Sequence, residues 1–137
     1  MFGICKKKGE TNQPKILVVD DDLDLVEIIQ RRLEYYKWEV VAASNGKEGL
    51  EKAASEKPDV IVLDIKMPVM NGHEMLRHLR QHPELKDIPV IMCSVSCEVQ
   101  DITTASSYNI SDYVTKPFDC MELIEKTFSI LETRDIS

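Results

Sequence analysis

The sequence predicts an α/β fold in which a doubly wound parallel sheet of five strands is covered by five helices. Short apolar runs alternate with amphipathic stretches from Lys15 onward, and each run is too short to form a buried helix. Most runs are rich in Val, Ile and Leu without polar alternation, which is typical of parallel strands buried on both faces. The stretches between them are about 10–15 residues long, a length that suits helical crossovers.

The strands are expected where these apolar runs fall. Their ranges are Ile16–Val19, Glu39–Ala43, Val60–Leu63, Val90–Cys93 and Tyr113–Thr115. The sequence shows no internal repeat and no second series of alternating strands and helices, so we expect one domain.

The first two helices are indicated by apolar periodicity and by a cap. Residues 23–36 place several large apolar side chains near one face of a helix: Leu25, Ile28, Ile29, Leu33 and Tyr36. Asn45 is a candidate N-cap for the second helix, because Glu48 three residues later resembles the partner of a capping box.

The other three helices differ in how well the sequence supports them. The third is expected at 72–81, since Pro83 must end it. The fourth, at about 97–108, is the most pliable segment, because it is rich in indifferent helix formers: Thr103, Thr104, Ser106 and Ser107. The fifth, at 121–131, carries an apolar stripe of Leu123, Ile124, Phe128 and Leu131.

Composition narrows the classes of function. The 137 residues suit a single domain at 15–133, with an N-terminal tail at 1–14 and a C-terminal tail at 134–137. A net charge of −7 disfavours direct binding to nucleic acid or anionic membranes. No apolar run approaches the roughly 20 residues of a membrane span, so we expect no membrane insertion and a cytoplasmic location. The four cysteines form no C-x-x-C pair, and we expect reduced thiols.

Polar side chains follow four of the predicted strands directly. The first strand leads into Asp20-Asp21-Asp22 and the third into Asp64, whereas Ser94 follows the fourth strand and Lys116 the fifth. Because the carboxyl ends of parallel strands form one ligand-binding crevice, these side chains are expected to meet there.

The expected crevice is chemically suited to a divalent cation and a phosphoryl group. Crowded carboxylates repel one another, so a positive charge must accompany them. Mg²⁺ commonly uses one or two carboxylates together with waters and phosphate oxygens. Lys116 adds a second positive charge and Ser94 a hydroxyl donor. Asp64 is then placed to act as a carboxylate nucleophile toward phosphorus, and an ionised carboxylate needs no histidine base.

These motifs resemble those of a response-regulator receiver domain, the phosphoacceptor module of two-component signalling. The resemblance covers residues 15–133. It rests on Ile16-Leu17-Val18-Val19-Asp20-Asp21, Val62-Leu63-Asp64-Ile65-Lys66-Met67-Pro68, Asn71-Gly72, Ser94 and Tyr113-Val114-Thr115-Lys116-Pro117-Phe118. It implies a flavodoxin-like sheet with the strand order 2-1-3-4-5, Mg²⁺ as cofactor, and phosphorylation by a histidine kinase or a histidine phosphotransfer protein.

The resemblance also implies a role for each matching residue. Asp64 would be phosphorylated, Asp21 would ligate Mg²⁺ directly and Asp20 through water. The main-chain carbonyl of Lys66 would be a further metal ligand. Lys116 would pair with a phosphoryl oxygen and precede a cis Lys116-Pro117 bond. Ser94 and Tyr113 would form the switch that reports phosphorylation.

The resemblance implies a signalling protein rather than an enzyme, one that catalyses only its own phosphorylation and slow dephosphorylation. The expected output surface, formed by the fourth helix, fifth strand and fifth helix, would bind a downstream effector protein. Val99 and Ile102 lie on that fourth helix, and a simpler interpretation packs them on the sheet.

Two departures from the family pattern bear on the site. Val95 follows Ser94 where a small residue is usual, so it is expected to alter access to Asp64 and the rate of phosphorylation or hydrolysis. Asn109 stands before the fifth strand where Gly is common, and Asn is the usual substitute in the left-handed conformation there.

Two other functions remain alternatives. A phosphorylation-independent pseudo-receiver is supported by Val95 alone. An aspartyl-phosphate phosphohydrolase would need a second Asp two residues after the nucleophile, where this chain has Lys66.

Several polar residues have simpler interpretations. Asp22 is expected to cap the first helix rather than bind metal, and the Lys66 side chain to be exposed. His73, His78 and His82 are expected on a solvated face, because no acidic or cysteine partner lies in phase nearby.

Overall fold

The computed structural model describes residues 13–95 and 98–136. Five strands form one parallel sheet in the order β2-β1-β3-β4-β5, and five helices complete the chain. The strands are β1 (Lys15–Val19), β2 (Glu39–Ala43), β3 (Val60–Leu63), β4 (Val90–Ser94) and β5 (Asp112–Thr115). The helices are α1 (Leu23–Glu34), α2 (Gly46–Glu56), α3 (Gly72–Gln81), α4 (Val99–Ser106) and α5 (Cys120–Ile136). The predicted fold class, strand order and number of helices are confirmed.

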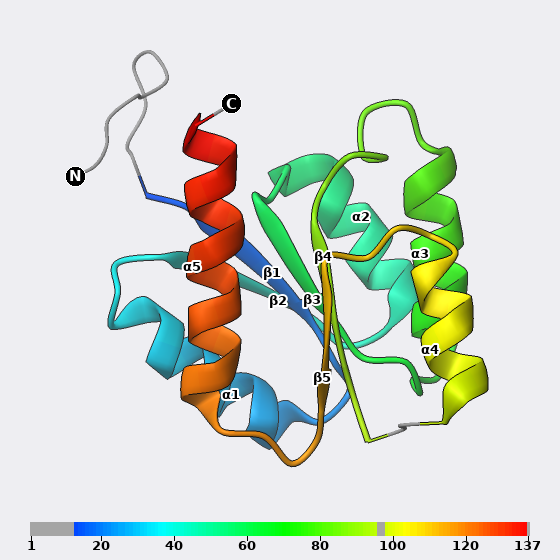
Figure 1. Ribbon diagram of the computed structural model, residues 1–137, viewed down its shortest axis with the longest axis horizontal. Helices are drawn as coiled ribbons and strands as arrows, with labels where there is room; N and C mark the ends of the chain where they lie inside the picture. The colour runs from blue at the N-terminus through cyan, green and yellow to red at the C-terminus, as the bar shows by residue number, and fades with distance from the viewer. Residues whose placement is uncertain (1–12, 96–97, 137) are drawn as a thin grey trace.

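The sheet is buried between two helical layers (Figure 1). Helices α1 and α5 cover one face, and α2, α3 and α4 cover the other. Each layer has its own apolar cluster, because successive side chains of a strand point to opposite faces. Leu17 and Val19 join the cluster under α2 and α3, whereas Ile16 and Val18 join the cluster under α1 and α5. This alternation explains why residues 16–19 of β1 are all apolar.

Some helices begin or end at other residues than predicted, because a turn can end a helix before its pattern of apolar residues ends. Helix α1 ends at Glu34, because the chain turns through Lys37 with a φ of 69°. Tyr36 therefore lies beyond the helix that was predicted to include it. Ile28, predicted on the buried face, is 52% exposed. Helix α4 is shorter than predicted and α5 is longer, continuing to Ile136 inside the predicted C-terminal tail.

Asparagine caps set the starts of two helices. Asn45 accepts a hydrogen bond from Glu48 N–H at 2.9 Å and caps α2, as predicted, but the Glu48 carboxylate accepts from the N–H of Ser44, the residue before the cap, at 2.8 Å. Asn71 accepts one from Glu74 N–H at 2.9 Å, and the Glu74 carboxylate accepts one from Asn71 N–H at 3.0 Å, which completes a capping box that we did not predict. At the end of α4, Asn109 takes the left-handed conformation expected for it, with a φ of 61°.

The structure does not test the start of two predicted segments. Residues 1–12 of the predicted N-terminal tail, and Cys97 at the predicted start of the fourth helix, lie outside the described residues. No helix in the described part of the chain is long and apolar enough to span a membrane.

Candidate functional site

Two aspartates are fixed at the carboxyl edge of the sheet by the hydrogen bonds that continue the strand ladders. Asp20 N–H donates to the Ala43 carbonyl and Asp64 N–H donates to the Val19 carbonyl, each at 3.0 Å. Asp20 and Asp64 therefore extend neighbouring strands, β1 and β3, by one paired residue. Because these strands run parallel, both side chains emerge at the same edge.

The carboxylates form one compact cluster with Asp21. One oxygen from each of Asp20, Asp21 and Asp64 lies within 4.8 Å of the others. Asp20 is 3% and Asp64 6% exposed, whereas Asp21 is exposed to solvent. Two buried carboxylates and one exposed carboxylate offer oxygen ligands that fit a hard divalent cation such as Mg²⁺, which keeps several waters.

Asp22, the next residue in the sequence, caps a helix and is not part of the carboxylate cluster. Its carboxylate accepts a hydrogen bond from Leu25 N–H at 3.2 Å and caps α1. Its own N–H donates to Asp20 Oδ1 at 2.9 Å and so orients that carboxylate. Asp22 therefore acts as a helix cap, as expected, and holds Asp20 in place.

Lys116 brings a positive charge to the same cluster. Its Nζ lies 2.6 Å from Asp20 Oδ2 and 3.6 Å from Asp64 Oδ2, and its side chain is only 13% exposed. Lys116 N–H donates to the Ser94 carbonyl at 2.8 Å, and the following Lys116–Pro117 peptide is cis, as the resemblance implied. The lysine thus neutralises part of the acidic cluster from the end of β5.

The electrostatics of the cluster make Asp64 a weak acid. Burial, followed by the charge of Asp20, raises the pKa of Asp64 to about 6, although Lys116 and the hydrogen bond from Ile65 N–H oppose the shift. Burial disfavours the charged form of Lys116, but its hydrogen bond to Asp20 and the charges of Asp64 and Asp20 outweigh that effect and raise its pKa. Without a cation, the cluster holds more negative charge than one lysine compensates.

Ser94 lies on β4, the strand next to β3, and Tyr113 lies on β5, the strand beyond β4. Ser94 is the last residue of β4 and is completely buried. Tyr113 is half-buried in β5 and packs against the cluster under α2, α3 and α4. Since β4 pairs with both β3 and β5, Ser94 stands between the acidic cluster and the β5 side of the sheet. Val95, which follows it, is 62% exposed.

The loop from Asp64 to Gly72 carries Lys66 and is closed at its base. Gly72 N–H donates to the Ile65 carbonyl at 2.8 Å, and a Cβ on Gly72 would overlap the Asp64 carbonyl oxygen. Glycine is therefore required there for close approach of the backbone. The Lys66 side chain is exposed, as expected, which leaves its main-chain carbonyl as the group of interest in this loop.

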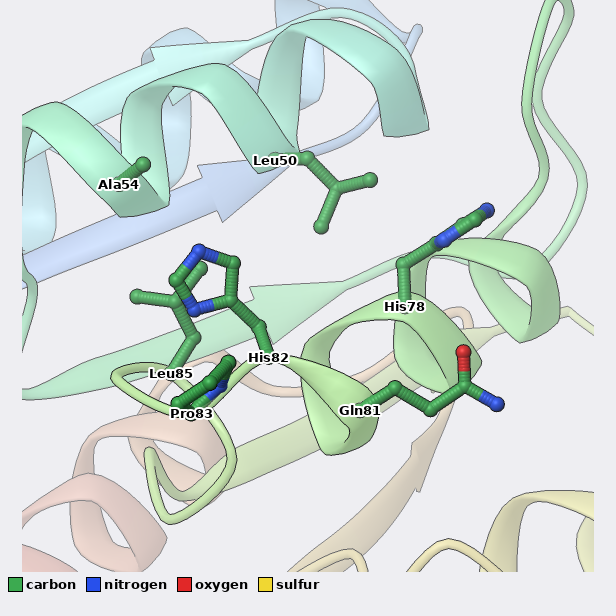
Figure 2. Close-up of a pocket in the computed structure, with 7 residues that line it drawn as sticks. All are labelled: Leu50, Ala54, His78, Gln81, His82, Pro83 and Leu85. Atoms are coloured by element: carbon green, nitrogen blue, oxygen red, sulfur yellow. The ribbon is translucent and has the colours of Figure 1, made fainter.

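A surface hollow of about 350 Å³, whose lining includes no residue of this cluster, lies between α2 and the end of α3 (Figure 2). Its lining includes His78 and His82, whose rings point in different directions. His78 is exposed, as expected, whereas His82 is half-buried and its Nδ1 accepts a hydrogen bond from Glu84 N–H at 3.1 Å.

The expectation for His73 is wrong. Its side chain is 20% exposed, and its Nε2 lies 3.3 Å from Asp101 Oδ1 on α4. The partner comes from another helix, 28 residues away in the chain, so the spacing within α3 carried no signal for it.

Comparisons with known proteins show the family of this chain. The family model of the response regulator receiver domain matches residues 16–128. The chain is 38% identical over 123 residues to the alkaline phosphatase synthesis transcriptional regulatory protein PhoP of Bacillus subtilis, covering 90% of this chain and 50% of that protein. It is 37% identical over 121 residues to the transcriptional regulatory protein PrrA of Mycobacterium tuberculosis, covering 88% of this chain and 51% of that protein. The chain thus spans about half the length of the curated relatives it matches.

Solved structures show the same similarity. The chemotaxis protein CheY4 of Vibrio cholerae is 27% identical with a TM-score of 0.81, over 86% of this chain and 98% of that chain. The Francisella response regulator 1452 receiver domain is 32% identical with a TM-score of 0.79, over 88% of this chain and 99% of that chain.

Proposed function

The chain belongs to the response regulator receiver domain family, and we propose that it is a cytoplasmic phosphoacceptor of two-component signalling. Asp64 takes a phosphoryl group, in the presence of Mg²⁺, from a histidine kinase or a histidine phosphotransfer protein. The module spans residues 15–133, and phosphorylation changes which downstream effector protein binds to the surface of α4, β5 and α5.

The observation that carries this proposal is the arrangement of charge around Asp64. Three carboxylates share one strand edge within 4.8 Å, and Lys116 Nζ reaches two of them. An acidic cluster that is only partly neutralised attracts a divalent cation, and cation and lysine together suit three phosphoryl oxygens. Asp64 is the cluster member that directly follows the central strand β3, which lies between β1 and β4.

Asp21, Asp64 and the Lys66 carbonyl are the groups that would hold Mg²⁺ directly, with Asp20 bound through water. The bound cation would supply charge neutralisation of the phosphoryl oxygens. The ionised carboxylate of Asp64 attacks phosphorus, so that an O–P bond forms as the bond between phosphorus and the donor imidazole nitrogen breaks. Ile65 N–H holds Asp64 Oδ1 at 2.8 Å and fixes the orientation of the attacking group.

Lys116 and Ser94 respond to the new group. Lys116 Nζ, 3.6 Å from Asp64 Oδ2, is near enough to pair with a phosphoryl oxygen after a small movement away from Asp20. The Ser94 hydroxyl donates to another oxygen, and Tyr113 moves with it. A gain of a few kcal/mol is enough to make a minor arrangement dominant.

Turnover of other substrates is not part of the proposal. A phosphohydrolase of this chemistry would place a carboxylate two residues after Asp64, where the exposed Lys66 stands. The printed names of the relatives describe transcriptional regulators, and with a net charge of −7 this chain would act on transcription through protein contacts rather than by touching nucleic acid.

Mass spectrometry after treatment with acetyl phosphate and Mg²⁺ tests the proposal. The wild-type protein should gain the mass of one phosphoryl group, and both chelation of Mg²⁺ and Asp64→Asn should abolish the gain. Asp87→Asn makes the same chemical change at a side chain that is 91% exposed and remote from the cluster, so it should be phosphorylated like wild type. An unmodified wild-type protein, or a fully phosphorylated Asp64→Asn variant, would contradict the proposal.

A further inference from the structure

Helix α4 is held in place by few apolar contacts. Of its residues 99–106, Ala105 alone is buried, whereas Val99 is 78% and Ile102 36% exposed. Val99 therefore does not pack on the sheet, and Ile102 is only partly covered, contrary to the simpler interpretation of the sequence. Glu98 at the N-cap position makes no side-chain capping hydrogen bond within the described residues. A helix with so little buried surface depends on polar contacts for its position.

The N-terminal half of α4 is fastened to α3 by His73 and Asp101. The two side chains are 20% and 23% exposed, and their contact is 3.3 Å long. Because a carboxylate oxygen only accepts, His73 Nε2 must carry the proton in this contact. Nδ1 of the same ring is buried and has no hydrogen-bond partner within the described residues. The bond through Nε2 is therefore the polar contact that fixes the imidazole.

The C-terminal end of α4 is fastened to the same helix by Arg80. Its Nε donates to the Tyr108 carbonyl at 2.7 Å and its Nη2 to the Asn109 carbonyl at 3.4 Å. The same guanidinium also donates to the carbonyls of Lys86 and Ile88. Arg80 thus anchors the C-terminal end of α4 through a guanidinium that makes several hydrogen bonds, whereas His73 contacts the N-terminal half of α4 through one. Figure 1 shows α4 lying along α3, the helix that carries both residues.

His73 is also connected to Asp64 through the close backbone contact at the base of the loop after β3. It follows Gly72, whose N–H is bonded to the Ile65 carbonyl and whose Cα lies against the Asp64 main chain. A displacement of Asp64 and Ile65 must therefore move Gly72, and with it His73. This route reaches α4 from the loop after β3, whereas Ser94 reaches α4 from the end of β4.

We propose that His73 is a positioning residue that couples Asp64 to α4 through Asp101, in parallel with Ser94. The inference rests on the proposed function, because it describes how phosphorylation of that site reaches the output surface. The latch, defined as the His73–Asp101 contact, holds the N-terminal half of α4 in the unmodified protein. Arg80 is the fixed end about which α4 shifts when the latch changes.

Amide hydrogen exchange tests the latch in the unmodified full chain. His73→Leu removes the donor, and exchange at α4 should speed up by about fivefold, the factor expected for one net hydrogen bond. His73→Gln is the matched variant, because its side-chain amide nitrogen reaches the position of Nε2, and it should restore most of the protection. The effects of His73→Leu and Asp101→Ala should be less than additive, and this shortfall measures the contact apart from any other effect of Asp101 on the helix end. Equal exchange in the Leu and Gln variants, or fully additive effects, would overturn the latch.

Beryllofluoride with Mg²⁺ tests the coupling, with adduct formation followed independently by ¹⁹F resonance. The change in α4 exchange upon adduct formation should survive in part in Ser94→Ala and disappear in Ser94→Ala combined with His73→Leu. If Ser94→Ala alone abolishes the change, or if the double variant keeps it, the coupling role of His73 is refuted. Failure of the wild-type protein to form any adduct would instead refute the proposed function and the coupling with it, while the exchange comparison in the unmodified chain still decides the latch.

Discussion

Asp64→Asn is expected to stabilise the metal-free protein at neutral pH, although it removes the proposed phosphoacceptor. Burial and the charge of Asp20 raise the pKa of Asp64 from 3.8 to about 6. The folded protein therefore keeps a proton on Asp64 at pH values at which the unfolded chain has released it. Stability is consequently lost as the pH rises from about 4 to about 6, and the loss persists at higher pH.

The size of the effect follows from that shift. Two pKa units at about 1.4 kcal/mol each place an upper limit of about 3 kcal/mol on the cost of ionised Asp64. Solvent at the open side of the cluster screens the interaction, so we expect Asp64→Asn to gain about 1–2 kcal/mol near pH 7.5. The gain should fall to about 0.5 kcal/mol near pH 4, where Asp64 is protonated in the folded protein and about two-fifths protonated in the unfolded chain, whose pKa is 3.8.

Urea unfolding in a chelator, followed by fluorescence of the buried Trp38, measures this difference. Asp87→Asn is the matched control, since its side chain is 91% exposed and the change should stay within about 0.5 kcal/mol. Mg²⁺ should stabilise wild type more than Asp64→Asn and so narrow the gap between them. A variant no more stable than wild type near pH 7.5, or a gain that is the same at both pH values, would refute this electrostatic reasoning.

Three further substitutions probe other parts of the structure, each measured by urea or thermal unfolding against wild type. In the presence of a chelator, Lys116→Ala should destabilise the protein by about 3 kcal/mol, because it leaves the charge of the buried Asp20 carboxylate without a partner. An unchanged unfolding midpoint would count against the ion pair. Asn71→Ala should cost about 1 kcal/mol by removing the cap of α3, and no loss would show that the capping box contributes nothing. Val69→Gly should gain about 1 kcal/mol, because a β-branched residue that is 75% exposed adopts a φ of 69° there; a loss of stability would show that the Val69 side chain makes a compensating contact.

Much of the fold was determined by local pattern. Strands β2 and β3 and helix α3 have the bounds predicted from sequence. Apolar runs set the extent of a buried strand and a proline ends a helix, and both effects are local in the chain. The placement of Asp20 and Asp64 at one edge followed from strand ends and the rule for parallel sheets. The capping box of Asn71 and Glu74 was equally readable, since it has the same Asn-x-x-Glu spacing that predicted the start of α2.

Packing between elements decided the rest. Sequence placed Lys116 near the acidic cluster, but only the fold decided that its Nζ lies 2.6 Å from Asp20 and 3.6 Å from Asp64. It also determined how far Asp64 is buried, and hence its raised pKa. His73 shows the limit most clearly: helical periodicity places it on α3, but its partner Asp101 belongs to α4. The distance between two helices depends on how each packs on the sheet, and no spacing within one helix encodes it.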